Sequence, residues 1–268
     1  MNDVSSVVVG DGTPVWVTGE GPTVVLVHGV LMDHRMWLPQ VEALRANYRV
    51  CCMDMLGHGD APNPPGERCL DDFVEQVRQV VDYFSDAGPP VLGGFSMGGL
   101  VAQAYAARYS ERLRGLVIMN AVYDRTVEQR AVVASRYQDM CDDGVAGAVR
   151  SARARWFTSN DDPRDIEAVI GWIQDGDFAS KRKAHRVFAT SDAEVTGTLR
   201  AVSCPALVMT GELDAGSTPD MAQAIAREIP NSSLSVLAGQ RHMMSVLDAP
   251  SVNARWLVFW PKCFGGPQ

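Results

Sequence analysis

The sequence predicts an α/β protein with a mostly parallel, eight-stranded sheet, helices on both faces of the sheet and a helical insertion. Three observations predict this class. Apolar strand-like runs alternate with amphipathic helical segments between residues 23 and 119, which is the order of successive β-α-β units. Residues 122–196 show helical patterns only. Strand-like runs then return at residues 206–210 and 233–237, so the insertion separates two parts of one sheet.

The strands are predicted from runs of apolar and β-branched residues. Residues 6–9 and 14–18 flank the turn signal Asp11-Gly12, so we expect an antiparallel pair at one edge of the sheet. Residues 23–27, Thr-Val-Val-Leu-Val, are typical of a strand buried on both faces. Further strands are expected at residues 48–53, 91–95, 113–119, 206–210 and 233–237.

Helices are predicted where apolar residues recur at helical spacing. Within the expected sheet they fall around residues 37–44, 71–84, 100–108, 222–229 and 251–259. Within the insertion they fall at residues 128–140, 146–157, 164–173 and 179–189. We therefore divide the chain into a core of residues 1–121 and 197–268 and a helical cap of residues 122–196. Ligands of parallel sheets bind beyond the carboxyl ends of the strands, so the cap is expected to lie over that edge.

The composition favours one folded core and a small-molecule ligand. The chain has 268 residues, 46% of them hydrophobic, which suffices for one full core with a small inserted unit. A net charge of −8 gives no basic face for nucleic acid. No apolar run approaches the roughly 18 residues that suggest a membrane span. We expect neither nucleic acid nor membrane as a partner, and a monomer or homodimer.

The cysteines and histidines indicate the compartment and the absence of a cofactor. The six cysteines show no C-x-x-C spacing, which favours free thiols in a reducing compartment. The N-terminal residues lack the basic and apolar regions of a signal peptide. The five histidines are scattered, without the pairing of metal ligands. We expect a cytoplasmic protein with no metal and no other cofactor.

A candidate nucleophile lies at the end of the run Val91-Leu-Gly-Gly-Phe95. Ser96 follows in Gly94-x-Ser96-x-Gly98, and a helical run begins directly behind it. A serine in such a strand-to-helix turn has its hydroxyl exposed at the sheet edge, and the flanking glycines leave room for the turn. This short pattern is weak by itself, because glycine and serine are common.

The residues downstream supply the groups that a serine needs. A hydroxyl is a poor nucleophile at neutral pH and requires a base, which is oriented by an acid. Asp214 follows one predicted strand in Gly211-Glu-Leu-Asp214, and His242 follows the last strand. Glu212 and Asp124 are the alternative acids, and the alternative for His242 is a surface-loop histidine. The order Ser96, Asp214, His242 predicts nucleophile, orienting acid and general base.

An oxyanion hole needs two backbone amides. The amide of Met97, directly after the serine, is the first candidate, and the amide of Val30, after the strand that ends at His28-Gly29, is the second. His28, His58 and Asp54 are expected to shape turns. The candidates for the substrate pocket border the site in sequence or fall in the cap: Leu31, Met32, Phe95, Arg155, Trp156 and Met243.

Taken in order, these motifs resemble the α/β-hydrolase superfamily over nearly the whole chain. They are His28-Gly29, Asp54-x-x-Gly57-His58-Gly59, Gly94-Phe-Ser-Met-Gly-Gly99, the helical insertion, Gly211-x-x-Asp214 and His242. Within the superfamily the chain is most similar to bacterial carboxylesterases and 3-oxoadipate enol-lactonases, through Arg155-Trp-Phe-Thr158 and Thr218-Pro219. Serine at position 96 speaks against haloalkane dehalogenases and epoxide hydrolases, which have aspartate there. Arg241, before His242, departs from the small residue usual in the family.

The resemblance implies an α/β-hydrolase fold and an esterase of the EC 3.1.1 type that cleaves a small ester or lactone through an acyl-enzyme on Ser96. Two alternatives stay open. One is a C–C bond hydrolase of meta-cleavage-type diketo acids, which would use the same three residues. The other is a ligand-binding protein without catalysis on the same fold. A cap arginine that binds a substrate carboxylate would fit an anionic lactone or a ring-cleavage product.

Overall fold

The computed structural model describes residues 4–265, so the outermost ends of the predicted core lie outside the described residues. Its sheet has eight strands in the order β1-β2-β4-β3-β5-β6-β7-β8. β1 and β2 form an antiparallel hairpin, β2 runs antiparallel to β4, and the remaining neighbours are parallel. The predicted sheet is therefore confirmed. The strands are β1 (Val4–Val9), β2 (Thr13–Thr18), β3 (Thr23–Val27), β4 (Arg49–Met53), β5 (Val91–Phe95), β6 (Gly115–Met119), β7 (Ala206–Gly211) and β8 (Ser232–Leu237).

The register of the parallel strands brings their carboxyl ends to one edge. Val27 at the end of β3 pairs with Met53 of β4 and with Gly94 of β5. Met119 at the end of β6 pairs with Phe95 and with Met209 of β7. The loops that follow these strands therefore begin side by side, and their polar residues are brought to one rim of the sheet.

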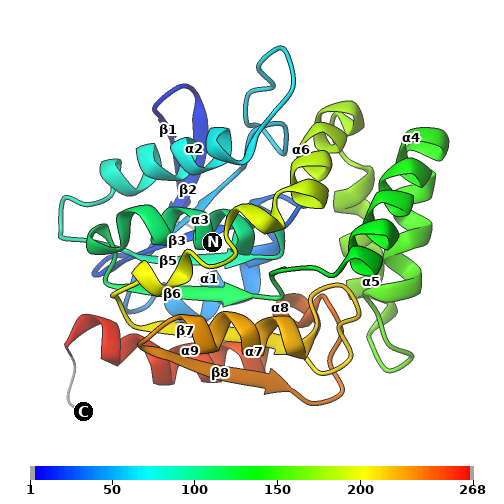
Figure 1. The fold of residues 1–268 in the computed structure, drawn as a ribbon. Helices are drawn as coiled ribbons and strands as arrows, with labels where there is room; N and C mark the ends of the chain where they lie inside the picture. The colour runs from blue at the N-terminus through cyan, green and yellow to red at the C-terminus, as the bar shows by residue number, and fades with distance from the viewer. Residues whose placement is uncertain (1–3, 266–268) are drawn as a thin grey trace.

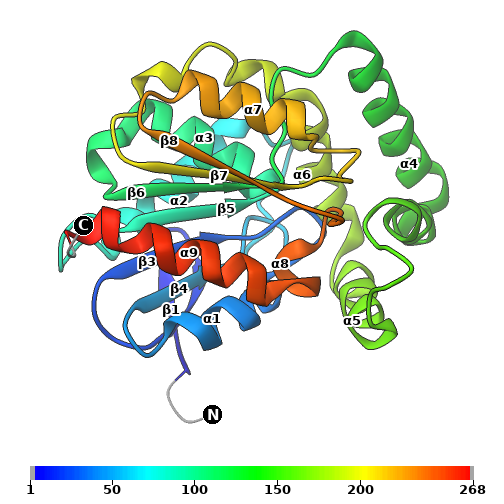
Figure 2. The same cartoon turned by 90° about the horizontal axis from the view of Figure 1, so that it is seen from below.

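Helices cover both faces of the sheet (Figures 1 and 2). α1 and α9 lie on one face, while α2, α3 and α7 lie on the other. None of the helices within residues 4–265 is both long enough and apolar enough to cross a membrane. The bounds are η1 (His34–Trp37), α1 (Leu38–Leu44), α2 (Leu70–Tyr83), α3 (Met97–Tyr109), η2 (Ser110–Arg112), α7 (Pro219–Glu228), α8 (Met244–Leu247) and α9 (Ala249–Phe264).

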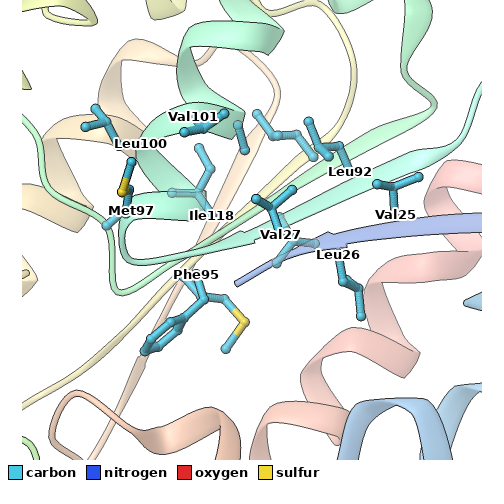
Figure 3. Close-up of a cluster of buried hydrophobic side chains, with 14 of the residues drawn as sticks. Val25, Leu26, Val27, Leu92, Phe95, Met97, Leu100, Val101 and Ile118 are labelled. Atoms are coloured by element: carbon cyan, nitrogen blue, oxygen red, sulfur yellow. The ribbon is translucent and has the colours of Figure 1, made fainter. Parts of the chain in front are cut away.

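The core lies between the central strands and these helices. Every residue of β3, β5 and β6 is buried, as expected for strands covered on both faces. Figure 3 shows the alternation of side chains along β3: Val25 and Val27 point to one side of the sheet, and Leu26 points to the other. Phe95 lies on the same side as Leu26. This packing fixes the end of β5, where the candidate nucleophile follows.

Between β6 and β7 the chain forms helices only. The three α-helices among them lie beyond the carboxyl ends of the strands (Figures 1 and 2), whereas the short helix at residues 199–201 packs against α3 and α7. Their bounds are α4 (Val127–Arg155), α5 (Pro163–Gln174), α6 (Phe178–Thr190), η3 (Asp192–Glu194) and η4 (Leu199–Ala201). Gly144 interrupts α4 with φ 60° and ψ −140°, which no helix contains. The sequence places the end of one helix and the start of the next around this glycine. The limits of the cap at residues 122 and 196 stay a prediction.

Candidate active site

Ser96 occupies the turn between β5 and α3 in a strained conformation. Its φ of 54° and ψ of −113° are rare for a residue with a side chain. The turn is tight because backbones approach closely: a Cβ at Gly94 would lie 2.2 Å from the Gly98 carbonyl oxygen, and one at Gly98 would lie 2.2 Å from that of Val27. The Ser96 amide donates to the Met119 carbonyl oxygen at 2.8 Å, which ties the turn to β6.

Ser96, His242 and Asp214 form a chain of two side-chain hydrogen bonds. His242 Nε2 lies 3.2 Å from Ser96 Oγ, and His242 Nδ1 lies 2.7 Å from Asp214 Oδ2. The three side chains come from the loops after β5, β8 and β7, and all three are buried. The structure therefore brings together the three residues that the sequence predicts as nucleophile, base and acid.

Asp214 is held by four donors. Oδ1 accepts from the amides of Gly216 at 2.8 Å and Ser217 at 3.0 Å, while Oδ2 accepts from Asn120 Nδ2 at 2.9 Å as well as from His242. Burial alone would raise the pKa of this carboxyl, but attraction to His242 and the hydrogen bonds outweigh burial and hold the pKa below its usual value. The acid is therefore ionised and fixed in direction.

Asn120 is a site residue that sequence reasoning missed. It follows β6 directly, is fully buried and has a left-handed φ of 47°. The sequence did contain a signal for this residue. Asn120 follows a predicted strand directly, as Ser96 and Asp214 do, and polar residues in this position meet at one edge of the sheet. The two alternative acids lie elsewhere. Glu212 accepts from the amide of Gly239, and Asp124 is exposed.

The candidate oxyanion loop follows β3. Gly29 accepts a hydrogen bond from the Met32 amide at 3.1 Å, which closes a turn over Val30 and Leu31. Leu31 has φ 71°, a conformation that costs a residue with a side chain about 1–2 kcal/mol. Within residues 4–265 no acceptor lies within hydrogen-bonding range of the Val30 amide or of the Met97 amide at the start of α3. Both predicted donors are thus free to bind an anionic oxygen.

Buried side chains hold Leu31 from both sides. Its amide donates to His58 Nε2 at 3.1 Å, and its carbonyl oxygen accepts from Lys181 Nζ of α6 at 3.4 Å. Lys181 also donates to the carbonyl oxygens of Trp172 and Asp175. A helix of the insertion therefore supports the loop that contains Val30.

His28 and His58 join the loops after β3 and β4 reciprocally. His28 Nε2 accepts from the Met55 amide at 2.9 Å, while His58 Nε2 accepts from the Leu31 amide. The Nδ1 atoms face the carbonyl oxygens of Gly29 and Leu56, to which they donate as neutral rings. Burial lowers the pKa of both imidazoles, His58 more strongly, which agrees with this neutral state. The structure thus confirms that these two histidines shape turns.

We expect replacement of His58 by Phe to lower kcat by roughly 10- to 100-fold, because small displacements of catalytic groups have effects of this size. The variant leaves the buried Leu31 amide without an acceptor and releases the strained turn that positions the Val30 amide. Steady-state kinetics of the purified variant provide the measurement. His58→Gln is the matched control, since its amide oxygen replaces Nε2 and should restore most of the rate. Equal kcat for the Phe variant and the wild type would contradict this role.

A cavity opens at Ser96 between the sheet edge and the insertion. The space between its walls, which includes open solvent at the mouth, is about 580 Å³. Among the predicted pocket residues, Leu31, Arg155 and Trp156 line it, together with Val30, Ser96 and His242. The other lining residues are Arg125, Val133, Arg136, Met140, Ala148, Ser151, His185, Phe188, Gly216 and Ser217.

The remaining predicted pocket residues lie in the core and do not line the cavity. Met32, Phe95 and Met243 are all but fully buried. The Phe95 ring supports the base from behind, with its centroid 5.0 Å from that of His242. The Trp156 ring lies 5.3 Å from His242. The two predicted residues next to Ser96 and His242 in sequence, Phe95 and Met243, therefore pack under the site and do not form a wall of the cavity.

Arg241 connects the histidine loop to the insertion. Its Nη1 donates to the carbonyl oxygen of Ala154, in the last turn of α4, at 3.2 Å. This contact fixes the end of α4 beside the loop of His242. Its guanidinium is thereby directed to the backbone of α4.

Stability is expected to fall as the pH decreases from 7.5 to 5.5. Burial lowers the pKa of His28 and His58, and lowers that of His185 to about 3. A histidine with a depressed folded-state pKa binds its proton in the unfolded chain first, so acid favours unfolding. Each can remove up to about 1.4 kcal/mol over this range. Urea unfolding at the two pH values measures the loss, and His185→Phe should reduce it; equal stability at both would contradict the prediction.

A chain with this sheet order and this serine turn is an α/β hydrolase. Residues 22–249 match the model of the alpha/beta hydrolase fold family, and the chain belongs to that family. The match spans the strands, the insertion and the loops of Ser96, Asp214 and His242. It confirms the fold and the superfamily predicted from the sequence.

Several similar proteins have the names of hydrolases. The (E)-2-((N-methylformamido)methylene)succinate hydrolase of Acinetobacter baylyi is 29% identical over 236 residues, which cover 88% of this chain and 89% of the relative. The 3-oxoadipate enol-lactonase 2 of the same organism is 26% identical and covers 87% of this chain and 86% of its own. The structure of a thermophilic esterase from Thermogutta terrifontis, solved with malate bound, superposes with a TM-score of 0.81 at 26% identity and covers 97% of this chain and 99% of its own.

Proposed function

We propose that this protein hydrolyses a small carboxylic ester or lactone through an acyl-enzyme on Ser96. The observation that supports this most is the hydrogen-bonded chain from Ser96 Oγ through His242 to Asp214 at the floor of a cavity. Relatives named as an enol-lactonase and an esterase support the same class of bond. No cofactor or metal is needed for this chemistry.

In the first half of the reaction, Ser96 Oγ attacks the substrate carbonyl carbon while His242 Nε2 accepts the hydroxyl proton. Asp214 accepts a hydrogen bond from His242 Nδ1–H and stabilises the imidazolium that forms. The negative charge moves to the carbonyl oxygen, which accepts hydrogen bonds from the amides of Val30 and Met97. The start of α3 adds its positive dipole end at the same place.

In the second half, collapse of the tetrahedral intermediate releases the alcohol, to which His242 gives its proton. For a lactone the alcohol stays attached to the acyl group. His242 Nε2 then accepts a proton from water while the water oxygen attacks the acyl carbon. When this second tetrahedral intermediate collapses, the bond from the acyl carbon to Ser96 Oγ breaks and His242 returns the proton to Oγ, which restores the free serine and releases the carboxylic acid. The hydrogen bonds from Asn120, Gly216 and Ser217 fix the carboxylate of Asp214. The carboxylate in turn keeps the His242 ring in one orientation, with a proton on Nδ1, through both halves of the reaction.

A panel of substrates tests the proposal. It contains 4-nitrophenyl acetate and pentanoate, a δ-lactone, an enol-lactone and a 1,3-diketone with an acidic side chain. Turnover of the esters or lactones, with a burst of nitrophenolate stoichiometric with enzyme, is the expected result. Cleavage of the diketone alone would assign the C–C hydrolase alternative to this chain. No turnover of any compound, together with tight binding of one, would assign the ligand-binding alternative.

A further inference from the structure

The cavity beside Ser96 contains more positive charge than its walls can balance. Three arginines line it, Arg125, Arg136 and Arg155, beside the neutral imidazole of His185, and of the three only Arg125 is paired, with Asp192. Asp214 is the acidic residue whose charge acts on the two from α4, but both of its oxygens are occupied by four donors, and no ion pair joins it to either arginine. Arg125 is buried, while Arg136 and Arg155 are half-buried. Charges withdrawn from water are normally paired, so the two unpaired arginines call for an explanation.

The break in α4 at Gly144 brings two of these arginines together. On one straight helix, residues 136 and 155 would lie about 28 Å apart, at a rise of 1.5 Å per residue. Here both line the same cavity, because the two halves of α4 fold against each other. Their contact is close: a Cβ at Gly147 would lie 2.6 Å from the Asp139 carbonyl oxygen. The fold of the helix thus creates the cluster.

Arg136 and Arg155 have no carboxylate partner in the part of the chain that the structure describes. Within residues 4–265 Arg136 makes no hydrogen bond or ion pair, and Arg155 donates only to Ser151 Oγ, at 3.0 and 3.3 Å. The outward-facing arginines of the same helix are paired. Arg153 binds Glu167 at 2.8 Å, and Arg150 binds Asp143. The contrast within one helix separates the cavity from an ordinary charged surface.

The third arginine leaves donors free as well. Arg125 binds Asp192 at 3.3 Å and the Phe188 carbonyl oxygen, but its Nε and Nη2 are buried without an acceptor among the described residues. His185 Nδ1 is likewise buried without a partner there. Asp192 is shared with Arg130 of α4. Unpaired buried donors of this kind are destabilising unless a ligand satisfies them.

The charges influence one another, as their pKa values indicate. Burial, followed by repulsion from Arg136, lowers the pKa of Arg155 to about 10. Burial and then the three arginines lower the pKa of His185 to about 3. An anion in the cavity would relieve both effects. A second hollow shares Arg125, Arg136, Val133 and Gly216 with the cavity, so the arginines stand between the serine and additional space.

We propose that the substrate has a free carboxylate, bound by Arg136 and Arg155 while its ester or lactone carbonyl lies at Ser96. Arg125 and His185 border the same position and supply further donors. The preferred substrates are therefore half-esters of dicarboxylic acids or lactones with an acidic side chain. This inference rests on the proposed function, because it specifies the substrate of the same site. Planar guanidinium groups bind carboxylates through two parallel hydrogen bonds, which gives direction as well as affinity.

A matched pair of esters tests the inference. Mono-4-nitrophenyl glutarate and 4-nitrophenyl pentanoate have the same leaving group and the same number of acyl carbons, and they differ by a terminal carboxylate in place of a methyl group. We expect the wild type to favour the glutarate by about 10- to 100-fold in kcat/KM, the value of a charge-assisted hydrogen bond. Glutarate itself should inhibit hydrolysis of the pentanoate ester competitively.

Variants of the arginines show whether the preference comes from them. Arg136→Gln and Arg155→Gln should each lower the ratio of kcat/KM, glutarate over pentanoate, by about 10-fold and weaken inhibition by glutarate. Arg153→Gln is the matched control: it removes a paired, outward-facing charge two residues from Arg155 and should keep the ratio of the wild type. Thermal unfolding checks that each variant is folded. Because Arg136→Gln and Arg155→Gln each remove an unpaired, half-buried charge, their Tm should equal or exceed that of the wild type.

The outcomes separate this inference from the proposed function. Equal kcat/KM for the two esters in the wild type, with a normal burst of nitrophenolate, would overturn the carboxylate site and leave the serine hydrolase standing. A preference for glutarate that all three variants retain would overturn the assignment to Arg136 and Arg155. Absence of turnover and of a burst with either ester would instead contradict the proposed function.

Discussion

Replacement of Ser96 by Ala is expected to lower kcat for ester hydrolysis on the order of 10⁴-fold or more. In the proposed mechanism Ser96 Oγ forms the acyl-enzyme, and His242 Nε2 has no other hydroxyl within hydrogen-bonding distance in residues 4–265. Steady-state and pre-steady-state kinetics on a 4-nitrophenyl ester measure both the rate and the loss of the burst.

The fold should tolerate this change. Alanine adopts the φ of 54° at the turn with the same strain as serine, and the hydroxyl makes its single protein hydrogen bond to His242. We expect a Tm within about 5 °C of the wild type, since the loss of one buried hydrogen bond costs roughly 0.5–1.5 kcal/mol. A folded Ala variant that retained a burst would refute Ser96 as nucleophile.

Replacement of Asp214 by Asn is expected to lower kcat by about 10⁴-fold, the usual effect of losing the acid while keeping its shape. An asparagine can turn its Nδ2–H toward His242 Nδ1, which then carries no proton. The proton moves to Nε2, and the imidazole can no longer accept the proton of Ser96. The pH dependence of kcat, together with the rate at its optimum, measures the effect.

Glu212→Gln provides the control for Asp214→Asn. Glu212 lies two residues away on the same loop, but it accepts from the amide of Gly239 and has no contact with His242 in the described chain. Its variant should retain kcat within about threefold, as for other exposed hydrogen bonds. A larger loss in the Glu212 variant than in the Asp214 variant would contradict the assignment of the acid.

The sequence could predict the sheet because its signals are local. The run at residues 23–27 has no polar residue after the first, as a strand buried on both faces requires, and it forms β3 with the same limits. The turn at Ser96 was predictable for the same reason, since the room that Gly94 and Gly98 provide is needed within five residues. Asp214 and His242 followed from the requirement that each loop begins at the same sheet edge.

The walls of the cavity could not be predicted in this way, because contacts between distant segments decide them. Arg136 faces the cavity only because Gly144 turns the chain back, and nothing near residue 136 distinguishes it from the outward-facing Arg153. Asn120 follows β6 and binds Asp214, which follows the neighbouring strand β7. Met32 and Phe95 are adjacent to the site in sequence, yet both side chains are buried in the core. Alternation along β5 directs Phe95 there, while Met32 lies at the end of the turn that begins at Gly29.

The conformation of the loop that contains Val30 also depends on contacts between distant segments. The sequence indicates that a strand ends there, but the left-handed Leu31 depends on His58 from the next loop and on Lys181 from the insertion. A strained residue persists only where its surroundings hold it. Its conformation is therefore a property of three segments, which no single segment reveals.

The central claim is that Ser96 forms a covalent acyl-enzyme activated by His242. The most direct measurement is mass spectrometry of the protein after reaction with a fluorophosphonate, with peptide mapping of the adduct. We predict one phosphonyl group per chain on Ser96, no adduct in Ser96→Ala, and labelling slowed by at least about 10³-fold in His242→Ala. An unmodified Ser96 in folded wild-type protein, or an adduct on another residue, would contradict the account.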